Sequence, residues 1–188
     1  MQVTYKSILL IATTLIAGLA CAATQWALQP KHSTLTFVAI QAGAPFEGTF
    51  EKFAADIRFD TQASTGSRFA VKIDLASVNT RDGERDDTLK GPELFAVEKW
   101  PTATYVAERF EHRGGNRFTA SGKLTLRGVT REVPIQFTFE KSATGTWLKG
   151  SGKLKRLDFG VGQGEWQDTS GVADEVEVRY ALLLTNRS

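Results

Sequence analysis

Cysteine, methionine and histidine are scarce in this chain of 188 residues, which has one Cys, one Met and two His. A lone Cys21 offers no partner for an intramolecular disulfide, and zinc sites are usually built from three or four Cys, His or carboxylate ligands. His32 and His112 are far apart, with no Cys or His at ligand spacing. We therefore expect no disulfide framework, no metal site and no resident cofactor.

Charge of one sign is also lacking, because 23 basic and 21 acidic residues leave a net charge of +2 without any long block of like charge. Nothing in this balance indicates a nucleic-acid partner. Proline is rare, with 5 residues, and 41% of the chain is hydrophobic, which is typical of a folded domain. The 12 Phe, 4 Trp and 3 Tyr favour strands over helices, and the length predicts one domain.

The first 22 residues have the pattern of a signal peptide. Lys6 precedes an uncharged apolar run over residues 8–20, and Ala20-Cys21-Ala22 supplies the small residues of a cleavage site. We expect cleavage after Ala22 or Ala23 and an exported domain over residues 23–188. Lipoprotein anchoring through Cys21 is the alternative, but Gly18-Leu19-Ala20 suits lipidation poorly, so simple secretion is favoured. The apolar run is shorter than the roughly 20 residues of a membrane span.

Alternation of apolar and polar residues dominates the rest of the chain, as in half-buried strands. It is clearest over residues 34–39, 53–59, 69–75, 132–139 and 175–185, and weaker over 104–110, 118–126 and 146–154. Turn signals at Gly114-Gly115-Asn116, Arg127-Gly128 and Thr144-Gly145 indicate hairpins. About eight strands with short turns predict an all-β antiparallel fold, and the pattern alone does not separate a barrel from a sandwich.

Residues 82–98 break this alternation. They are rich in charge and carry Gly91-Pro92 in the middle, so we expect a short helix over Glu84–Lys90, lying across the sheet, followed by a second turn. The acidic run that begins at Asp82 resembles a calcium loop, but Asp87 occupies the position that requires glycine. A solvated helix start with local ion pairs is the favoured interpretation.

Patterns of known catalytic motifs fail in a similar way. His32-Ser33 has no Gly-x-Ser-x-Gly context, and residues 160–164 lack the third glycine and the strand-then-helix setting of a dinucleotide loop. We expect a glycine-rich bend there, between the last two strands. Acidic residues could also pair for acid–base catalysis, as in glycosidases, but no local spacing favours such a pair. The candidates are Asp56, Glu108, Asp158 and Asp174.

The inner face of the predicted sheet is strongly apolar. An eight-stranded barrel is just wide enough to be filled by side chains or to hold one small ligand, so a solid core and a ligand-holding pore both remain open on the pattern.

Several strings distributed over nearly the whole exported region resemble the YceI-like family of exported bacterial proteins. They are Pro30-Lys31-His32-Ser33, Gly48-Thr49-Phe50, Ser77-Val78-Asn79-Thr80, Arg85-Asp86, Leu89-Lys90, Phe95, Trp100-Pro101, the run Gly122–Thr130, Asp158-Phe159-Gly160 and Ala173-Asp174-Glu175-Val176. One departure is Gln29, where many members have an acidic residue three positions before the histidine.

The resemblance implies an extended lipocalin-like β-barrel in the periplasm that holds a long isoprenoid, such as a prenyl quinone or prenyl phosphate, without catalytic apparatus. Carried over to this chain, the pore lining falls on Phe37, Phe53, Ile57, Phe69, Val71, Ile73, Phe95, Leu124, Leu126, Ile135, Phe137, Phe159, Val178 and Tyr180. Candidates for contact with the head group are His32, Ser33, Thr80, Arg81 and Arg85.

Three hypotheses follow for function. The first is a periplasmic carrier or storage protein for a long-chain isoprenoid or similar amphiphile, with transient membrane contact during exchange. The second is an enzyme acting on an isoprenoid in the same pore. The third is a partner-binding module whose barrel is packed solid by aromatic rings.

Overall fold

The computed structural model describes residues 23–62 and 66–187. The predicted signal peptide, residues 1–22, lies outside the described residues, and so does the question of lipidation at Cys21. The strands are β1 (Gln25–Leu28), β2 (Thr34–Gln41), β3 (Ala44–Phe50), β4 (Phe53–Arg58), β5 (Arg68–Asp74), β6 (Val78–Asn79), β7 (Thr102–His112), β8 (Arg117–Leu126), β9 (Val129–Ser142), β10 (Gly145–Lys155) and β11 (Glu175–Asn186). The helices are η1 (Pro30–His32), η2 (Leu75–Ser77), α1 (Gly83–Lys90), η3 (Arg156–Phe159) and η4 (Gly164–Gln167).

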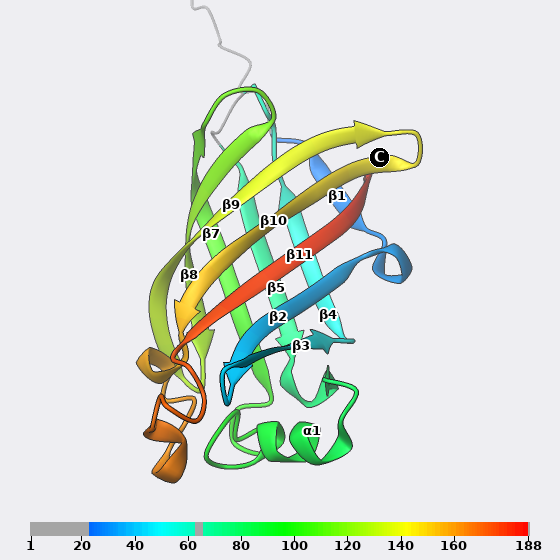
Figure 1. Cartoon of the computed structure of the whole chain (residues 1–188). Coiled ribbons are helices and arrows are strands. Elements are labelled where there is room, and N and C mark those ends of the chain that lie inside the picture. The colour runs from blue at the N-terminus through cyan, green and yellow to red at the C-terminus, as the bar shows by residue number, and fades with distance from the viewer. Residues whose placement is uncertain (1–22, 63–65, 188) are drawn as a thin grey trace, which may run out of the picture.

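The strands close into an antiparallel barrel (Figure 1). Hydrogen bonding runs in the order β1-β4-β5-β7-β8-β9-β10-β11, and β11 pairs again with β1, so eight strands complete the ring. Over the stretch that β1 spans, closure leaves these strands without a free edge, which is how such sheets avoid edge-to-edge association. The prediction of an eight-stranded antiparallel barrel is therefore confirmed, and the sandwich is excluded.

A flap made of β2, β3 and β6 extends from this ring where β11 changes its pairing partner. One part of β11 pairs with β1 at Leu184–Asn186, and the part nearer its start pairs with β2 at Glu177–Ala181. Between β1 and β2 the chain leaves the ladder at η1. There the Ser33 hydroxyl accepts a hydrogen bond of 3.0 Å from the amide of Leu183, which would otherwise lack a ladder partner. Strand β2 then pairs with β3, and β3 with β6. The alternation pattern did not predict β3.

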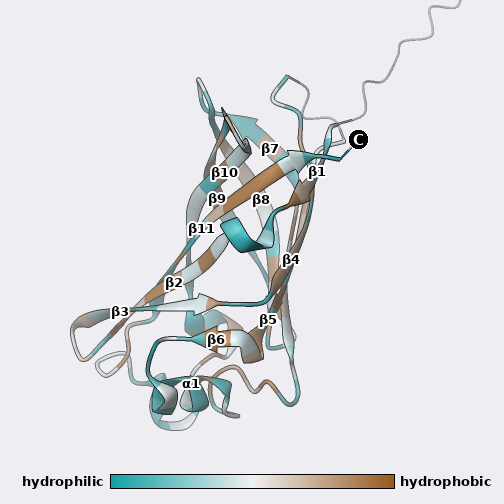
Figure 2. Ribbon diagram, turned by 90° about the vertical axis from the view of Figure 1, so that its right-hand side faces the viewer, coloured by the Kyte–Doolittle hydropathy of each residue, from teal (hydrophilic) through white to brown (hydrophobic). Residues whose placement is uncertain are grey.

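Helix α1 lies across the lower end of the barrel in Figure 1, and not across a face of the sheet as we expected. Asp82 caps it, because its carboxylate accepts the Arg85 amide at 3.1 Å. Asp86 accepts both the amide and the hydroxyl of Thr80, at 2.8 and 2.7 Å. The acidic run therefore starts a helix, and Figure 2 shows α1 as hydrophilic against strands that carry the hydrophobic residues.

A bulge changes the inward face of β7 halfway along the strand. The pairing with β8 shifts register between Ala107 and Arg109, so Glu108 is an extra residue. Before it, Ala103, Tyr105 and Ala107 are buried; after it, Phe110 packs inside. Because side chains alternate strictly along a strand, the bulge moves Phe110 to the interior and Arg109 to the exterior.

No helix among residues 23–62 and 66–187 is both long and apolar enough to cross a membrane.

Candidate functional site

A cavity of about 470 Å³ occupies the half of the barrel nearest α1. This volume falls in the range of roughly 300–1,000 Å³ that is usual for small-molecule sites. Side chains from β2–β5 and β7–β11 form its walls, and Leu89, Leu94 and Phe95, from α1 and the turn after it, close its lower side.

Most of the residues predicted to line a pore border this cavity. Those that do are Phe37, Phe53, Ile57, Phe69, Val71, Ile73, Phe95, Leu124, Leu126, Ile135, Val178 and Tyr180. Phe137 and Phe159 do not: Phe137 packs among other rings of the barrel, and Phe159, the last residue of η3, is buried. Contact of the lining residues with a ligand stays a prediction.

The other half of the barrel is solid. Six rings, which we call the phenylalanine plug, interlock there: Phe59, Phe69, Phe110, Phe118, Phe137 and Phe139. Phe59 lies at the centre, with ring centroids 5.0 Å from those of Phe118 and Phe139, mostly in the edge-to-face geometry that aromatic rings prefer. The barrel thus combines a hollow half with a packed half, so neither the solid core nor a pore through its whole length describes it.

Two tyrosines in the cavity wall keep their hydroxyl groups away from the cavity. Tyr105 donates to the carbonyl of Val133 at 3.0 Å, and Tyr180 donates to that of Gln136 at 2.9 Å. Burial raises the pKa of both phenols above the ordinary value of 10.0. Both rings therefore present their apolar faces, and their protons are held by the main chain.

The cavity opens beside the N-terminal end of α1. Asp82 and Glu84 border it and are exposed to solvent, and Arg85, half-buried, follows them. The Arg85 guanidinium is 3.4 Å from the Asp82 carboxylate and lies 4.5 Å over the ring of Phe46 on β3. The cation–π contact joins the flap to the helix, whereas the ion pair lies within the start of the helix, and both interactions are weak at a partly exposed site.

Arg156 is the charged residue buried most deeply in the cavity wall, with 4% of its surface exposed. Its Nε, Nη1 and Nη2 atoms donate to the carbonyls of Ala173, Val161 and Val172 at 3.0, 3.0 and 2.7 Å. Burial lowers its pKa, and the nearby Asp174 partly opposes that shift. The guanidinium thereby fixes the irregular segment 160–174 against the end of β10.

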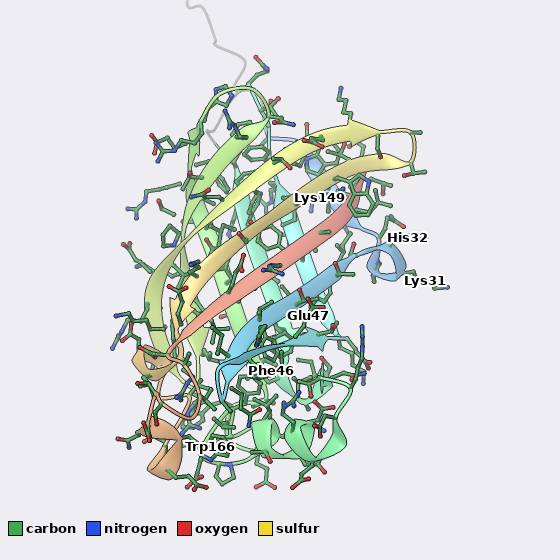
Figure 3. All side chains as sticks on the ribbon, viewed as in Figure 1. Lys31, His32, Phe46, Glu47, Lys149 and Trp166 are labelled. Carbon is green, nitrogen blue, oxygen red and sulfur yellow. The ribbon has the colours of Figure 1, made fainter. Side chains whose placement is uncertain are left out.

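Of the predicted head-group residues, the structure places only Arg85 on the cavity. Figure 3 shows His32 outside the barrel wall, where Ser33 is engaged in the ladder of β11. Thr80 is buried and hydrogen-bonded to Asp86, and Arg81 is exposed to solvent and does not line the cavity. We therefore no longer expect His32, Ser33, Thr80 or Arg81 to contact a ligand directly.

The scattered carboxylates are not gathered in the cavity either. Asp56 and Glu108 lie near Arg68, at 4.0 and 3.3 Å, outside the cavity lining. Asp174 accepts the amide of Leu157 at 3.0 Å, and Asp158 is exposed. Within residues 23–62 and 66–187, no three His, Cys, Asp or Glu side chains are grouped closely enough to hold a metal ion.

Several lining residues were not among those predicted. Leu35, Leu148 and Leu182 continue the alternation of their strands, so the same pattern would have found them. Arg156 and Trp166 come from the short helices η3 and η4, which have no periodic signal, and their places depend on how segment 160–174 folds back. Nothing in the sequence pattern marks them.

A closed eight-stranded antiparallel barrel with an apolar cavity at one end is a lipocalin-like β-barrel. Residues 26–184 match the family model of the YceI-like domain. The chain belongs to the YceI-like domain family, as its sequence strings indicated.

Individual relatives agree with this assignment. BcnA of Burkholderia cenocepacia, a solved structure, superposes with a TM-score of 0.80 at 33% identity, over 83% of this chain and 98% of that one. A "UPF0312 protein" of Shewanella oneidensis is 29% identical over 161 residues, 81% of this chain and 84% of the relative. A structure described as a polyisoprenoid binding domain of Saccharophagus degradans has a TM-score of 0.70 at 19% identity, over 88% of this chain and 99% of that one, and at that identity it supports the fold alone.

Proposed function

We propose that this protein binds the tail of a polyisoprenoid or a similar long-chain amphiphile in the cavity, as a carrier or store and not as an enzyme. The apolar cavity of about 470 Å³, hollow in one half of the barrel, is the observation that carries the proposal. A packed barrel of the same sequence pattern would have had no room for a ligand. The description of the Saccharophagus relative names the same ligand class.

Polarity along the cavity sets the orientation of such a ligand. The inner part is lined by Ile57, Phe69, Leu148 and Leu182, and the charged residues Asp82, Glu84 and Arg85 stand at the mouth. An amphiphile therefore enters tail first and leaves its polar head beside α1. A prenyl quinone and a prenyl phosphate both have this shape.

Catalysis is not part of the proposal, because the tyrosine and Arg156 side chains of the cavity wall are engaged in hydrogen bonds to the main chain. The tyrosine hydroxyls donate to main-chain carbonyls, and burial holds their protons. The nitrogens of Arg156 donate to three carbonyls.

Exchange of the ligand with a membrane is consistent with the free energies of transferring its tail. Each buried CH₂ gains about 0.8 kcal/mol relative to water. A lipid tail in a bilayer is already in hydrocarbon, so transfer into the cavity gains little and the tail also loses conformational freedom. We expect modest net affinity for the tail, loading and release at a membrane, and, from the leader, action in the periplasm.

The test is the cargo itself. Protein purified without added lipid is extracted with organic solvent, and the extract and the delipidated protein's uptake of a prenyl quinone are measured by mass spectrometry. Val178→Glu places a charge on the cavity wall and is expected to abolish uptake, whereas Val38→Glu, on β2 and outside the cavity lining, is expected to retain it. No extracted long-chain compound together with no uptake by the native chain would contradict the proposal.

A further inference from the structure

The cavity ends where the phenylalanine plug begins, and the strand registers fix that boundary. Ile57 and Phe69 border the cavity and pair with each other across β4 and β5. Leu148 also borders it, and its partner on β9 is Phe139, a plug residue. The inner end of the cavity is therefore a wall of rings, of which Phe69 is the one that faces the cavity.

The plug resists displacement because its rings come from five separate segments of the barrel. Phe69 of β5 lies 4.7 Å from Phe110 of β7 and 5.1 Å from Phe137 of β9, measured between ring centroids. Phe110 is inside only because of the bulge at Glu108. A close-packed interior of this kind does not yield to a ligand atom without moving several rings together.

The two ends of the cavity therefore differ in what they accept. The polar head remains at the mouth, where Asp82, Glu84 and Arg85 meet solvent. The tail runs inward until its last unit meets Phe69. A longer tail must push its head out of the mouth or disturb the rings, and a shorter tail leaves apolar wall without contact.

We propose that the phenylalanine plug, with Phe69 at its face, determines the length of the isoprenoid tail that this protein selects. This inference rests on the proposed function and adds the residues that set the ligand's size. A phenyl ring occupies about the space of one isoprene repeat, so removal of the Phe69 ring lengthens the cavity by about one repeat.

The experiment offers delipidated protein an equimolar series of all-trans prenyl alcohols that differ by one isoprene repeat, and native mass spectrometry reads the length that is retained. Phe69→Ala is expected to shift the preferred length upward by one repeat. Leu148→Phe adds a ring at the same end and is expected to shift it downward, and it carries the test if Phe69→Ala does not fold. Phe37→Ala is the matched control, because it removes a ring from the part of the cavity wall that the flap forms, where Phe37 packs against Phe46 and Phe50.

Each outcome distinguishes the two proposals. A native chain that selects a length which Phe69→Ala and Leu148→Phe leave unchanged overturns the role of the plug but leaves the proposed function intact. Equal shifts in Phe69→Ala and Phe37→Ala overturn it as well, because total volume and not the inner wall would then set the length. Binding of no member of the series by any variant contradicts the proposed function itself.

Discussion

Arg156 offers the most direct test of how the cavity is built. Its guanidinium, 4% exposed, supplies hydrogen bonds to three main-chain carbonyls in segment 160–174. Arg156→Ala removes these donors from the buried carbonyl of Val161 and from the half-buried carbonyls of Val172 and Ala173, and an acceptor left unpaired away from water costs about 1–3 kcal/mol. Against this stands the several kcal/mol spent on removing the cation from water. We expect a net loss of about 3 kcal/mol in the free energy of unfolding, a large share of a typical stability of about 5–15 kcal/mol.

Urea unfolding followed by tryptophan fluorescence measures this loss, and Trp166 lies within the segment that Arg156 secures. With a slope of about 1–3 kcal/mol per molar urea, the midpoint is expected to fall by about 1–3 M. The urea midpoint of Arg156→Lys is expected to lie between those of the native chain and of Arg156→Ala, because one ammonium group does not match the planar guanidinium that reaches three acceptors. Lys155→Ala, its exposed neighbour, is the control. A loss below about 0.5 kcal/mol for Arg156→Ala, as for ordinary surface positions, would refute the reasoning.

Three further predictions concern the barrel wall. Gly150→Ala would place a Cβ 2.0 Å from a backbone oxygen on β9 and 2.5 Å from the Tyr180 hydroxyl, so we expect a lower thermal midpoint, whereas Gly171→Ala, with no atom within 4 Å, should leave it unchanged. Because burial raises the phenol pKa values of Tyr105 and Tyr180 above 10.0, the native state holds these protons longer than the unfolded chain. Stability should therefore fall as the pH rises beyond about 10, more gently in Tyr180→Phe, and a pH series of urea midpoints with no such decline would contradict this. Ser33→Ala removes the hydroxyl that completes the ladder of β11 and is expected to lower the free energy of unfolding by about 1 kcal/mol in the same urea assay; an unchanged midpoint would show that water replaces it.

The antiparallel strands could be predicted from their pattern because each buries one face, whereas the choice of a barrel over a sandwich came from the family resemblance. The alternation around Phe37, Ile73 and Val178 is a local property of the chain, and together with the family resemblance it identified most of the cavity wall. The pattern does not reveal how the interior divides, because Phe137 and Ile135 occupy equivalent positions on β9, yet one ring is in the plug and the other side chain lines the cavity.

The polar side of the site was harder to predict for a different reason. His32 and Ser33 lie close to the start of β2 in sequence, but the outward step of the chain leaves them outside the wall. Arg156 reaches the cavity only because segment 160–174 returns to enclose it. Such placements depend on contacts between distant parts of the chain, which no local period records.

The extra residue in β7 has a consequence for how this strand tolerates change. Glu108 points to solvent on an exposed stretch, so almost any other side chain should be accepted there. Deletion of the same position should be accepted as well, because Arg109 alone would then separate Ala107 from Phe110, and strict alternation keeps both of these residues inside and in register with β8. The position therefore tolerates both substitution and loss, and the order of inward-facing residues on β7 does not depend on it.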